Sequence, residues 1–245
     1  MTELVAEDVQ RALRAVADPS RASVQMRFFK AGPGEYGEGD VFIGVQVPVQ
    51  RKVAKTFESL PTDECARLLA SEVHEDRLTA LLVLVRRMQR ARGKDADAVK
   101  RAVYRCFIAN RARVNNWDLV DTSAEHIVGP FAIEGSKERA FVDELSRAES
   151  LWDRRIAMMS TFYFIKRGDF SWALEVAARL LEDEEDLLHK ASGWMLREIG
   201  GRGGLVELRA FLRAHAAVMP RTMLRYAIEK LPEAERKKWL AVKRA

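Results

Sequence analysis

The chain has 245 residues and a formal net charge of +5; 48% of its residues are hydrophobic and 31% are charged. This composition is ordinary for a soluble globular protein with a sizeable core. No stretch approaches the roughly 18 consecutive apolar residues of a membrane span, and residues 1–8 lack the basic start and apolar core of a secretory signal. A membrane-spanning or exported protein is therefore not expected.

Positive charge is concentrated in two stretches of the chain. Residues 77–113 contain eleven Arg or Lys and two acidic residues, and residues 209–245 contain ten Arg or Lys and three acidic residues. Acidic residues gather elsewhere, as in residues 182–186. Such segregation is typical of a protein that binds a polyanion, although helix faces exposed to solvent would explain the same charges.

Taken in chain order, apolar residues recur at helical spacing almost throughout, and the alternation typical of a strand is confined to residues 41–47. Several prolines lie where a helix is expected to start or stop, and glycines fall between the periodic segments. These residues are Pro19, Pro48, Pro61, Pro130, Pro220, Pro232, Gly93, Gly168 and the glycines of residues 200–204. The pattern predicts an all-α protein with about a dozen helices of roughly 10–17 residues.

A Gly-rich connector at residues 31–47 follows a helix expected over residues 21–30. Residues 32–37 (GPGEYG) match the G-x-G-x-x-G pattern of dinucleotide-binding loops, but no strand precedes them and no helix opens at the last glycine. Glu35 and Glu38 would also repel a phosphate. We therefore interpret the segment as a flexible connector that a partner could order.

Beyond the connector, the helices are expected in pairs, and one helix of each pair opens with a charged or aromatic residue. Measured between Arg77, Asp118, Arg155, Lys190 and Arg221 in these openings, the steps are 41, 37, 35 and 31 residues. They lie near the ~40-residue period of two-helix HEAT-type repeats. We predict one domain over residues 1–245, a HEAT-like helical-repeat solenoid whose inner helices line a concave basic groove.

Motifs of several common enzyme classes are absent from the sequence. The four His residues have no metal-like spacing with Cys, and neither a G-x-S-x-G motif nor a Walker loop occurs. Cys65 and Cys106 stand alone and are expected to be free thiols in a reducing compartment. We expect no metal and no cofactor.

The segment NWDLVD at residues 116–121 combines an indole with two carboxylates. Trp117 and Asp121 are four residues apart, so they share one helix face. Asp118, near the helix start, is explained by the helix dipole, and Trp117 could belong to the core. The dipole explains Asp121 less well. An acid beside a bound polyanion lowers the affinity of the protein for that polyanion, so Asp121 is expected to have a specific role at this position.

A second indole, Trp194, lies between two cations, because Lys190, Trp194 and Arg197 follow one another along one helix stripe. The small neighbours at residues 191–193 would leave the helix surface open, while a core position for Trp194 is the alternative. Arg155 could project into the same groove or form a surface ion pair with a nearby acid.

Six short segments, in the same order, resemble the AlkD family of bacterial DNA alkylation repair glycosylases. They are MRFFK at 26–30, YGEGD at 36–40, VFIGV at 41–45, NWDLVD at 116–121, LWDRR at 151–155 and KASGW at 190–194. The resemblance implies a HEAT-like solenoid with DNA in its concave face, and excision of N3- and N7-alkylated purines without a base-enclosing pocket. It also implies Asp121 as the catalytic carboxylate, Trp117 and Trp194 as flanking aromatics, and Arg155 as a contact to the DNA backbone.

This activity agrees with the chemistry of the residues, because an alkylated purine is already cationic and leaves readily. One carboxylate and two indoles would stabilise the developing sugar cation without a metal. The remaining cations expected to contact phosphates are Arg51, Arg77, Lys190, Arg197, Arg221 and Arg225. The expected partner is double-stranded DNA carrying alkylated purines, the expected location is the bacterial cytoplasm at the nucleoid, and a monomer suffices.

Two other functions stay open at the level of the sequence. A non-catalytic HEAT-like protein that recognises damaged or branched DNA would keep the basic groove, but would gain nothing from an acid within it. A helical-repeat scaffold for proteins would bind its partner with little sensitivity to salt, and the uneven distribution of charge argues against it.

Overall fold

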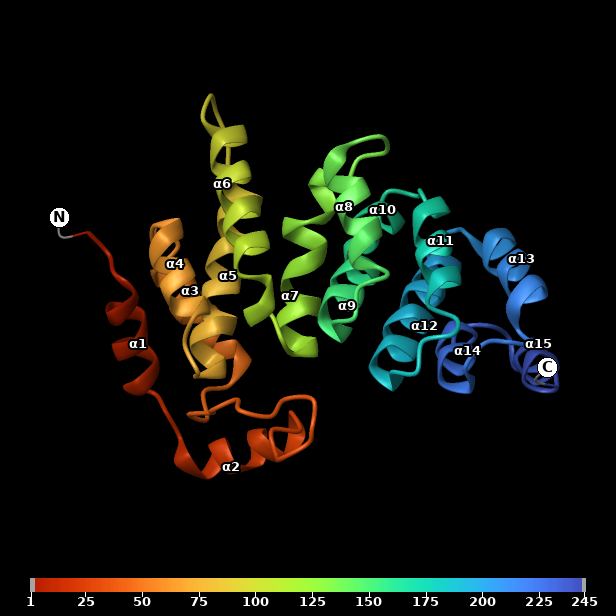
Figure 1. Ribbon diagram of the computed structural model, residues 1–245, viewed down its shortest axis with the longest axis horizontal. Helices are drawn as coiled ribbons and strands as arrows, with labels where there is room; N and C mark the ends of the chain where they lie inside the picture. The colour runs from red at the N-terminus through yellow and green to blue at the C-terminus, as the bar shows by residue number, and fades with distance from the viewer. Residues whose placement is uncertain (1–2, 244–245) are drawn as a thin grey trace. The chain divides into compact units, whose positions relative to one another are not determined.

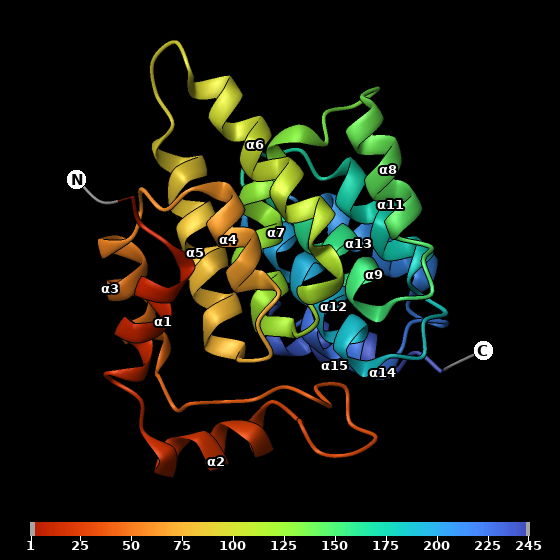
Figure 2. The ribbon, with the colours of Figure 1, turned by 60° about the vertical axis from the view of Figure 1, so that its left-hand side comes forward.

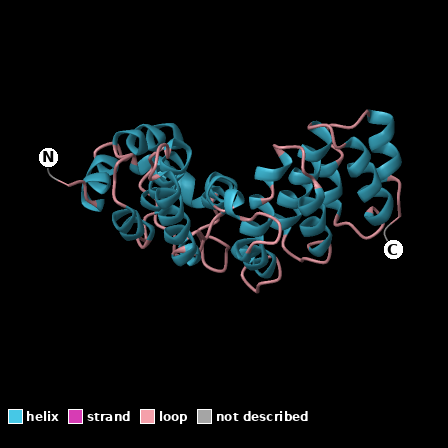
Figure 3. Cartoon of the chain, turned by 90° about the horizontal axis from the view of Figure 1, so that it is seen from above, coloured by secondary structure: helices cyan, strands magenta, loops and turns pink. Residues whose placement is uncertain are grey.

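The computed structural model describes residues 3–243, and their regular elements are helices joined by loops (Figure 3). Within this range no strand forms: the alternating residues 41–47 contribute one parallel bridge, between Val41 and Val73. The all-α prediction is confirmed. None of the helices in this range has both the length and the apolar character that a membrane crossing requires.

The chain divides into two compact units, with the boundary between residues 127 and 128. The first unit contains α1 (Ala6–Arg14), α2 (Pro19–Phe28), α3 (Val47–Thr56), α4 (Thr62–Leu69), α5 (His74–Arg90), α6 (Ala96–Ala109), the 3-10 helix η1 (Arg111–Arg113) and α7 (Trp117–Ile127) (Figure 1). Helices α3, α5 and α7 pack side by side, while α4 and α6 pack against α5 from the other layer. That the two units act as one solenoid domain with a concave groove stays a prediction.

Helix α5 is the centre of the first unit. Its residues 78–85 are buried on every side, because α1, α3, α4, α6 and α7 all pack against it. Burial of each large aliphatic side chain contributes about 1.5–3 kcal/mol. Helix α2 and the connector that follows it lie beneath the end of the unit at which α5 begins (Figures 1 and 2).

The second unit contains η2 (Gly129–Phe131), α8 (Lys137–Leu145), α9 (Leu151–Ser160), α10 (Phe162–Ile165), α11 (Ser171–Arg179), α12 (Asp186–Gly201), α13 (Leu205–His215), α14 (Arg221–Ala227) and α15 (Glu233–Leu240). Helices α9, α12 and α14 form one layer, and α8, α11 and α13 pack on it. A Cβ on Gly193 of α12 would lie 2.5 Å from the carbonyl oxygen of Met223 in α14. The glycine therefore permits the close approach of these two helices.

The helix boundaries follow the predicted punctuation. Pro19 and Pro48 lie in the first turns of α2 and α3, and Pro61, Pro220 and Pro232 directly precede α4, α14 and α15. The openings predicted for one helix of each pair lie within the first five residues of α5, α7, α9, α12 and α14, at Arg77, Asp118, Arg155, Lys190 and Arg221 respectively. These are the helices of a single layer within each unit, so the prediction of paired helices in a helical-repeat fold is confirmed.

Both cysteines are free thiols, as predicted. Cys65 is buried and Cys106 is half-buried. Burial raises the pKa of Cys65 to about 12 and that of Cys106 to about 11, so both stay protonated and unreactive at neutral pH.

Candidate functional site

A cavity of about 550 Å³ opens on the first unit between α3, α5, α7 and the end of α2. The residues that line it are Phe28, Phe29, Val47, Arg51, Ala54, Leu82, Val85, Arg86, Gln89, Trp117, Asp118, Asp121, Thr122 and His126. Its wall is aromatic where α2 meets α7, and its two carboxylates both come from α7. This mixture of apolar walls with a few polar groups is typical of a ligand site.

Trp117 is the first residue of α7 and forms part of the cavity wall. Its backbone N–H donates to the side-chain oxygen of Asn116 at 2.9 Å. The indole stacks on Phe29 with centroids 5.3 Å apart and meets Phe28 edge-on at 5.8 Å. Phe28 is 63% exposed, so this aromatic cluster reaches from the core to the surface.

Asp121 lies one helical turn after Trp117 and lines the same cavity. The prediction that these two residues share a helix face is confirmed. Asp121 is half-buried, so a ligand in the cavity would meet both a carboxylate and an indole. Its catalytic role stays a prediction.

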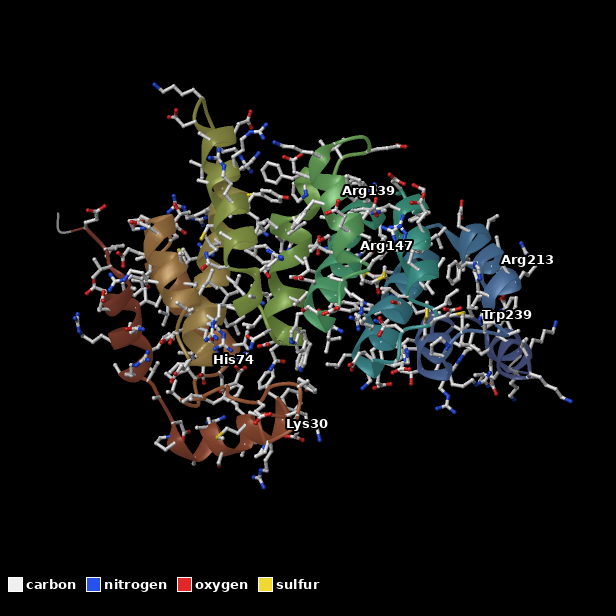
Figure 4. All side chains as sticks on the ribbon, viewed as in Figure 1. Lys30, His74, Arg139, Arg147, Arg213 and Trp239 are labelled. Atoms are coloured by element: carbon white, nitrogen blue, oxygen red, sulfur yellow. The ribbon has the colours of Figure 1, made fainter. Side chains whose placement is uncertain are left out.

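Asp118 is mostly buried and has a structural role that is broader than the expected dipole interaction. Its Oδ1 accepts a hydrogen bond from the backbone N–H of Leu119 at 2.8 Å, and its Oδ2 lies 2.8 Å from Nε2 of His74. The other ring nitrogen of His74, Nδ1, lies 2.9 Å from Oδ2 of Asp40. His74 lies at the start of α5 (Figure 4). Through these two contacts it joins the start of α5 to both the connector and the start of α7.

The charges around His74 compensate one another. Burial lowers the pKa of His74, but Asp118 and Asp40 outweigh it and raise the pKa to about 9, so the ring is an imidazolium at neutral pH. Burial raises the pKa of Asp40, but His74 and Arg77 outweigh it and hold the pKa below its usual value. Two cations and two carboxylates therefore form a buried group without net charge.

The connector is fixed by the same end of α5. The carboxylate of Glu75, which is fully buried, accepts hydrogen bonds from the backbone N–H groups of Ile43, Gly44 and Val45 at 2.9–3.2 Å. These hydrogen bonds from Glu75 explain why the segment needs no strand to satisfy its backbone N–H groups. Residues of the chain itself therefore order this part of the connector.

Arg77 does not contact DNA phosphates, and that prediction is wrong. The residue is 0% exposed, and its Nη2 donates to Oδ1 of Asp40 at 2.5 Å. Its Nη1 donates to the backbone carbonyls of Ser71 and Glu72 at 2.9 and 3.1 Å. The guanidinium closes the loop before α5 and compensates Asp40, so it cannot reach a ligand at the surface.

Other cations do lie beside the cavity. Arg51 of α3 is exposed, as a phosphate contact requires. Arg86 of α5 also lines the cavity and forms a salt bridge of 2.6 Å with Glu58. Among residues 3–243, no group of three or more His, Cys, Asp or Glu lies where it could hold a metal ion.

In the second unit, Trp194 of α12 is half-buried, with its ring centroid 5.9 Å from that of Phe162. The small residues 191–193 before it are buried, and Gly193 lies against α14, so they do not leave open surface as expected. Arg155 of α9 is 4% exposed and donates from Nη1 to the carbonyl of Leu187. This burial contradicts a surface position for Arg155, while its expected contact to the DNA backbone stays a prediction.

The remaining residues of the second unit that were predicted to contact DNA differ in their partners and in their exposure. Lys190 forms a partly exposed salt bridge of 2.7 Å with Asp186, and Arg197 pairs with Glu229. Arg221 donates from Nη2 to the carbonyl of Leu240 at 2.7 Å, which places its guanidinium at the C-terminal end of α15. These three residues and Arg225, whose side chain is exposed, stay predicted contacts.

The sequence model of a family described as DNA alkylation repair enzyme matches residues 9–231. The chain belongs to this family. The fold is similar to the solved structure of a predicted DNA alkylation repair enzyme from Enterococcus faecalis, with a TM-score of 0.60 and 17% identity over 89% of this chain and 97% of that one. No curated protein matches the chain significantly.

Membership in the DNA alkylation repair family indicates a role in the repair of alkylated DNA, with DNA as the partner. For this repair protein, sequence reasoning missed His74 and Asp40 as neighbours of the candidate site. The signal for them was present: four consecutive polar residues, 74–77 (HEDR), precede an apolar run, and all four are buried. A buried polar run of this kind needs partners from elsewhere in the chain.

Proposed function

We propose that this chain is a DNA glycosylase that releases positively charged N3- and N7-alkylated purines by hydrolysis of the N-glycosidic bond. The observation that carries the proposal is the pairing of Asp121 with Trp117 on the wall of one cavity, in a member of the DNA alkylation repair family. The proposed catalytic residues are Asp121, Trp117 and Trp194.

The chemistry requires little from the protein, because the alkylated base carries a positive charge before the reaction starts. The bond between C1′ and the purine nitrogen breaks, and its electron pair leaves with the base, which becomes neutral. Positive charge then develops on the sugar, where the carboxylate of Asp121 would stabilise it and orient a water molecule. The water oxygen bonds to C1′ and releases a proton, which gives an abasic site and a free base.

The aromatic residues would act on the same cation. An indole face attracts a positive charge with about 0.5–2 kcal/mol, depending on its exposure to water. Trp117 supplies one such face beside Asp121, and its stack on Phe29 fixes the orientation of the ring. Trp194, partly exposed on α12, is proposed as the second aromatic residue.

Excision without enclosing the base is a separate part of the proposal. The cavity beside Asp121, at about 550 Å³, lies in the size range of small-molecule sites and could also admit a base. A 2-aminopurine placed beside the lesion distinguishes the two modes by its fluorescence. A base that leaves the stack makes the probe brighter, whereas excision from the stacked duplex leaves its emission low.

DNA affinity would come from cations that contact phosphates without reading sequence. We propose Arg51 in the first unit for this role, and Lys190, Arg197, Arg221 and Arg225 in the second. Arg155 is 4% exposed, and we propose that it contacts the DNA backbone through this small exposed part of the residue. All of these residues come from one chain, so a monomer would suffice. Binding that rests on such contacts weakens steeply as salt is added.

The experiment that tests the proposed activity is the release of bases from duplex DNA treated with a methylating agent. We expect free 3-methyladenine and 7-methylguanine in the soluble fraction, and no release of uracil from a uracil-containing duplex. Tight binding to DNA without any free base would contradict the glycosylase and favour a non-catalytic protein that recognises damaged or branched DNA.

A further inference from the structure

The imidazole of His74 lies between two carboxylates and beneath the aromatic cluster of the candidate site. Nδ1 faces Asp40 at 2.9 Å, and Nε2 faces Asp118 at 2.8 Å. Phe42 stacks on the ring with centroids 4.7 Å apart, and Phe29 lies 5.0 Å away. His74 is 1% exposed, so water cannot replace any of these contacts.

This geometry requires a proton on both ring nitrogens. A carboxylate can only accept hydrogen bonds, and a neutral imidazole has one N–H donor and one lone pair. If His74 lost a proton, the lone pair of one ring nitrogen would face a carboxylate oxygen of Asp40 or Asp118. The arrangement therefore holds only while His74 is an imidazolium.

The contacts of His74 lead directly to the candidate catalytic residues. Asp118 follows Trp117 in the chain and precedes Asp121 by less than one helical turn. Phe29 contacts both rings, at 5.0 Å from His74 and 5.3 Å from Trp117. His74 itself does not line the cavity, so it can affect a ligand there only through these neighbours.

We propose that His74 is a positioning residue, which as an imidazolium between Asp40 and Asp118 fixes the first turn of α7 and so aims Trp117 and Asp121 into the cavity. Its kinetic consequence rests on the proposed glycosylase function, whereas its structural consequence does not. The proposal predicts that the site loses its geometry when pH rises far enough to deprotonate the ring.

The other charged groups around His74 all have hydrogen-bond or ion-pair partners of their own. They are Arg77, which binds Asp40; Glu75, which binds the connector; Asp76 with Arg14 of α1; and Arg113 of η1, which donates to the carbonyl of Ser71. The pKa of His74, raised to about 9, places the transition well above that of an ordinary histidine.

The first test uses the unaltered protein. In a ¹H–¹⁵N NMR spectrum at pH 7.5, we expect both ring nitrogens of His74 to carry slowly exchanging protons, with assignment by their loss in His74→Gln. Acrylamide quenching of Trp117, isolated by subtracting the spectrum of Trp117→Phe, should increase as pH rises through about 9. A single ring proton at pH 7.5, or quenching that does not change up to pH 10, would overturn the proposal.

The second test is kinetic and uses His74→Gln beside the matched control His215→Gln, which alters a histidine of α13. We expect the single-turnover rate at saturating protein to fall up to about 100-fold in His74→Gln. The Kd for DNA should be unchanged, because no phosphate contact is altered. The wild-type rate should decline as pH rises through about 9, and the residual rate of His74→Gln should not.

The two proposals fail in different ways. Absence of base release from the wild-type protein would refute the glycosylase, while the NMR and quenching experiments would still decide the role of His74. A His74→Gln variant with the wild-type rate, pH profile and Trp117 quenching would refute the positioning role and leave the glycosylase in place.

Discussion

Nε2 of His74 lies 2.8 Å from Oδ2 of Asp118, which joins the first residue of α5 to the second residue of α7. Because Asp118 stands between Trp117 and Asp121 in the chain, this contact connects the core of the first unit to its candidate site. Asp118, which the helix dipole would explain from the sequence alone, is thus also a buried partner of the His74 cation.

Replacement of the buried Arg77 should affect stability and leave the salt dependence of DNA binding unchanged. Arg77→Met leaves the buried carboxylate of Asp40 without its guanidinium partner, which should lower the free energy of unfolding by about 3–5 kcal/mol. Urea denaturation measures this loss. A stable variant whose DNA affinity has become less sensitive to salt would show instead that Arg77 contacts phosphates.

Replacement of the exposed Arg225 should have the opposite effect. In Arg225→Ala we expect unchanged stability, weaker binding to any duplex, and a slope of log K against log salt that is smaller by about one. Arg11→Ala is the matched control, because Arg11 is an exposed arginine of α1 with its own partner, Asp8. Equal slopes for wild type, Arg225→Ala and Arg11→Ala would exclude Arg225 from the interface.

Two glycines of the connector provide a matched pair for stability. Gly44 has a φ of +84°, and a Cβ there would lie 1.9 Å from the carbonyl oxygen of Asp18. Gly39 has a φ of +86° with no atom within 4 Å of an added Cβ. Gly39→Ala should cost about 1–2 kcal/mol from its backbone conformation alone, whereas Gly44→Ala must also displace backbone and should cost more than 3 kcal/mol. Equal losses in thermal or urea unfolding would contradict the close approach at Gly44.

Stability should decrease as the solution becomes alkaline. The pKa of His74 is raised to about 9 in the folded chain, above the value of about 6.5 for an unperturbed histidine. Its contribution is therefore complete below pH 6.5 and is lost as pH rises through 9, with a magnitude of about 3 kcal/mol. Urea unfolding between pH 6 and 10 measures this, and His74→Gln should remove the decrease. A wild-type stability that stays constant over this range would contradict the buried imidazolium.

Low pH should also lower the stability of the fold, through Asp40 in the same buried group. The pKa of Asp40 is lowered in the folded chain by His74 and Arg77, which outweigh its burial. Its contribution is therefore complete above the unfolded pKa and is lost as pH falls through the lower, folded value. Asp40→Asn should reduce this sensitivity to acid in the same unfolding experiment. If the stability of Asp40→Asn fell at low pH as steeply as that of the wild type, Asp40 would not be the source of the sensitivity to acid.

Local patterns in the sequence were enough to predict the helices and the pairing of Trp117 with Asp121 in the candidate site. The prolines at the starts of α2, α3, α4, α14 and α15 act within a few residues of their own position, so their effect can be read without a structure. Trp117 and Asp121 share a face because helical geometry alone determines it.

Contacts between distant segments could not be predicted in this way. The partner of Arg77 is Asp40, 37 residues earlier, and local charge cannot distinguish a buried cation from one that faces DNA. For the same reason residues 191–193 were expected to lie open, although all three are buried and Gly193 lies against α14. The ionic group at His74 depends on three segments that meet only in the folded chain.

The central claim is that Asp121 carries the chemistry, and single-turnover release of 7-methylguanine from a duplex tests it most directly. Wild type, Asp121→Asn and the control Asp97→Asn, which alters an exposed acid of α6, should be compared at saturating protein. We predict that Asp121→Asn loses most base release and still binds DNA, while Asp97→Asn retains the wild-type rate. Release by Asp121→Asn at the wild-type rate would contradict the account.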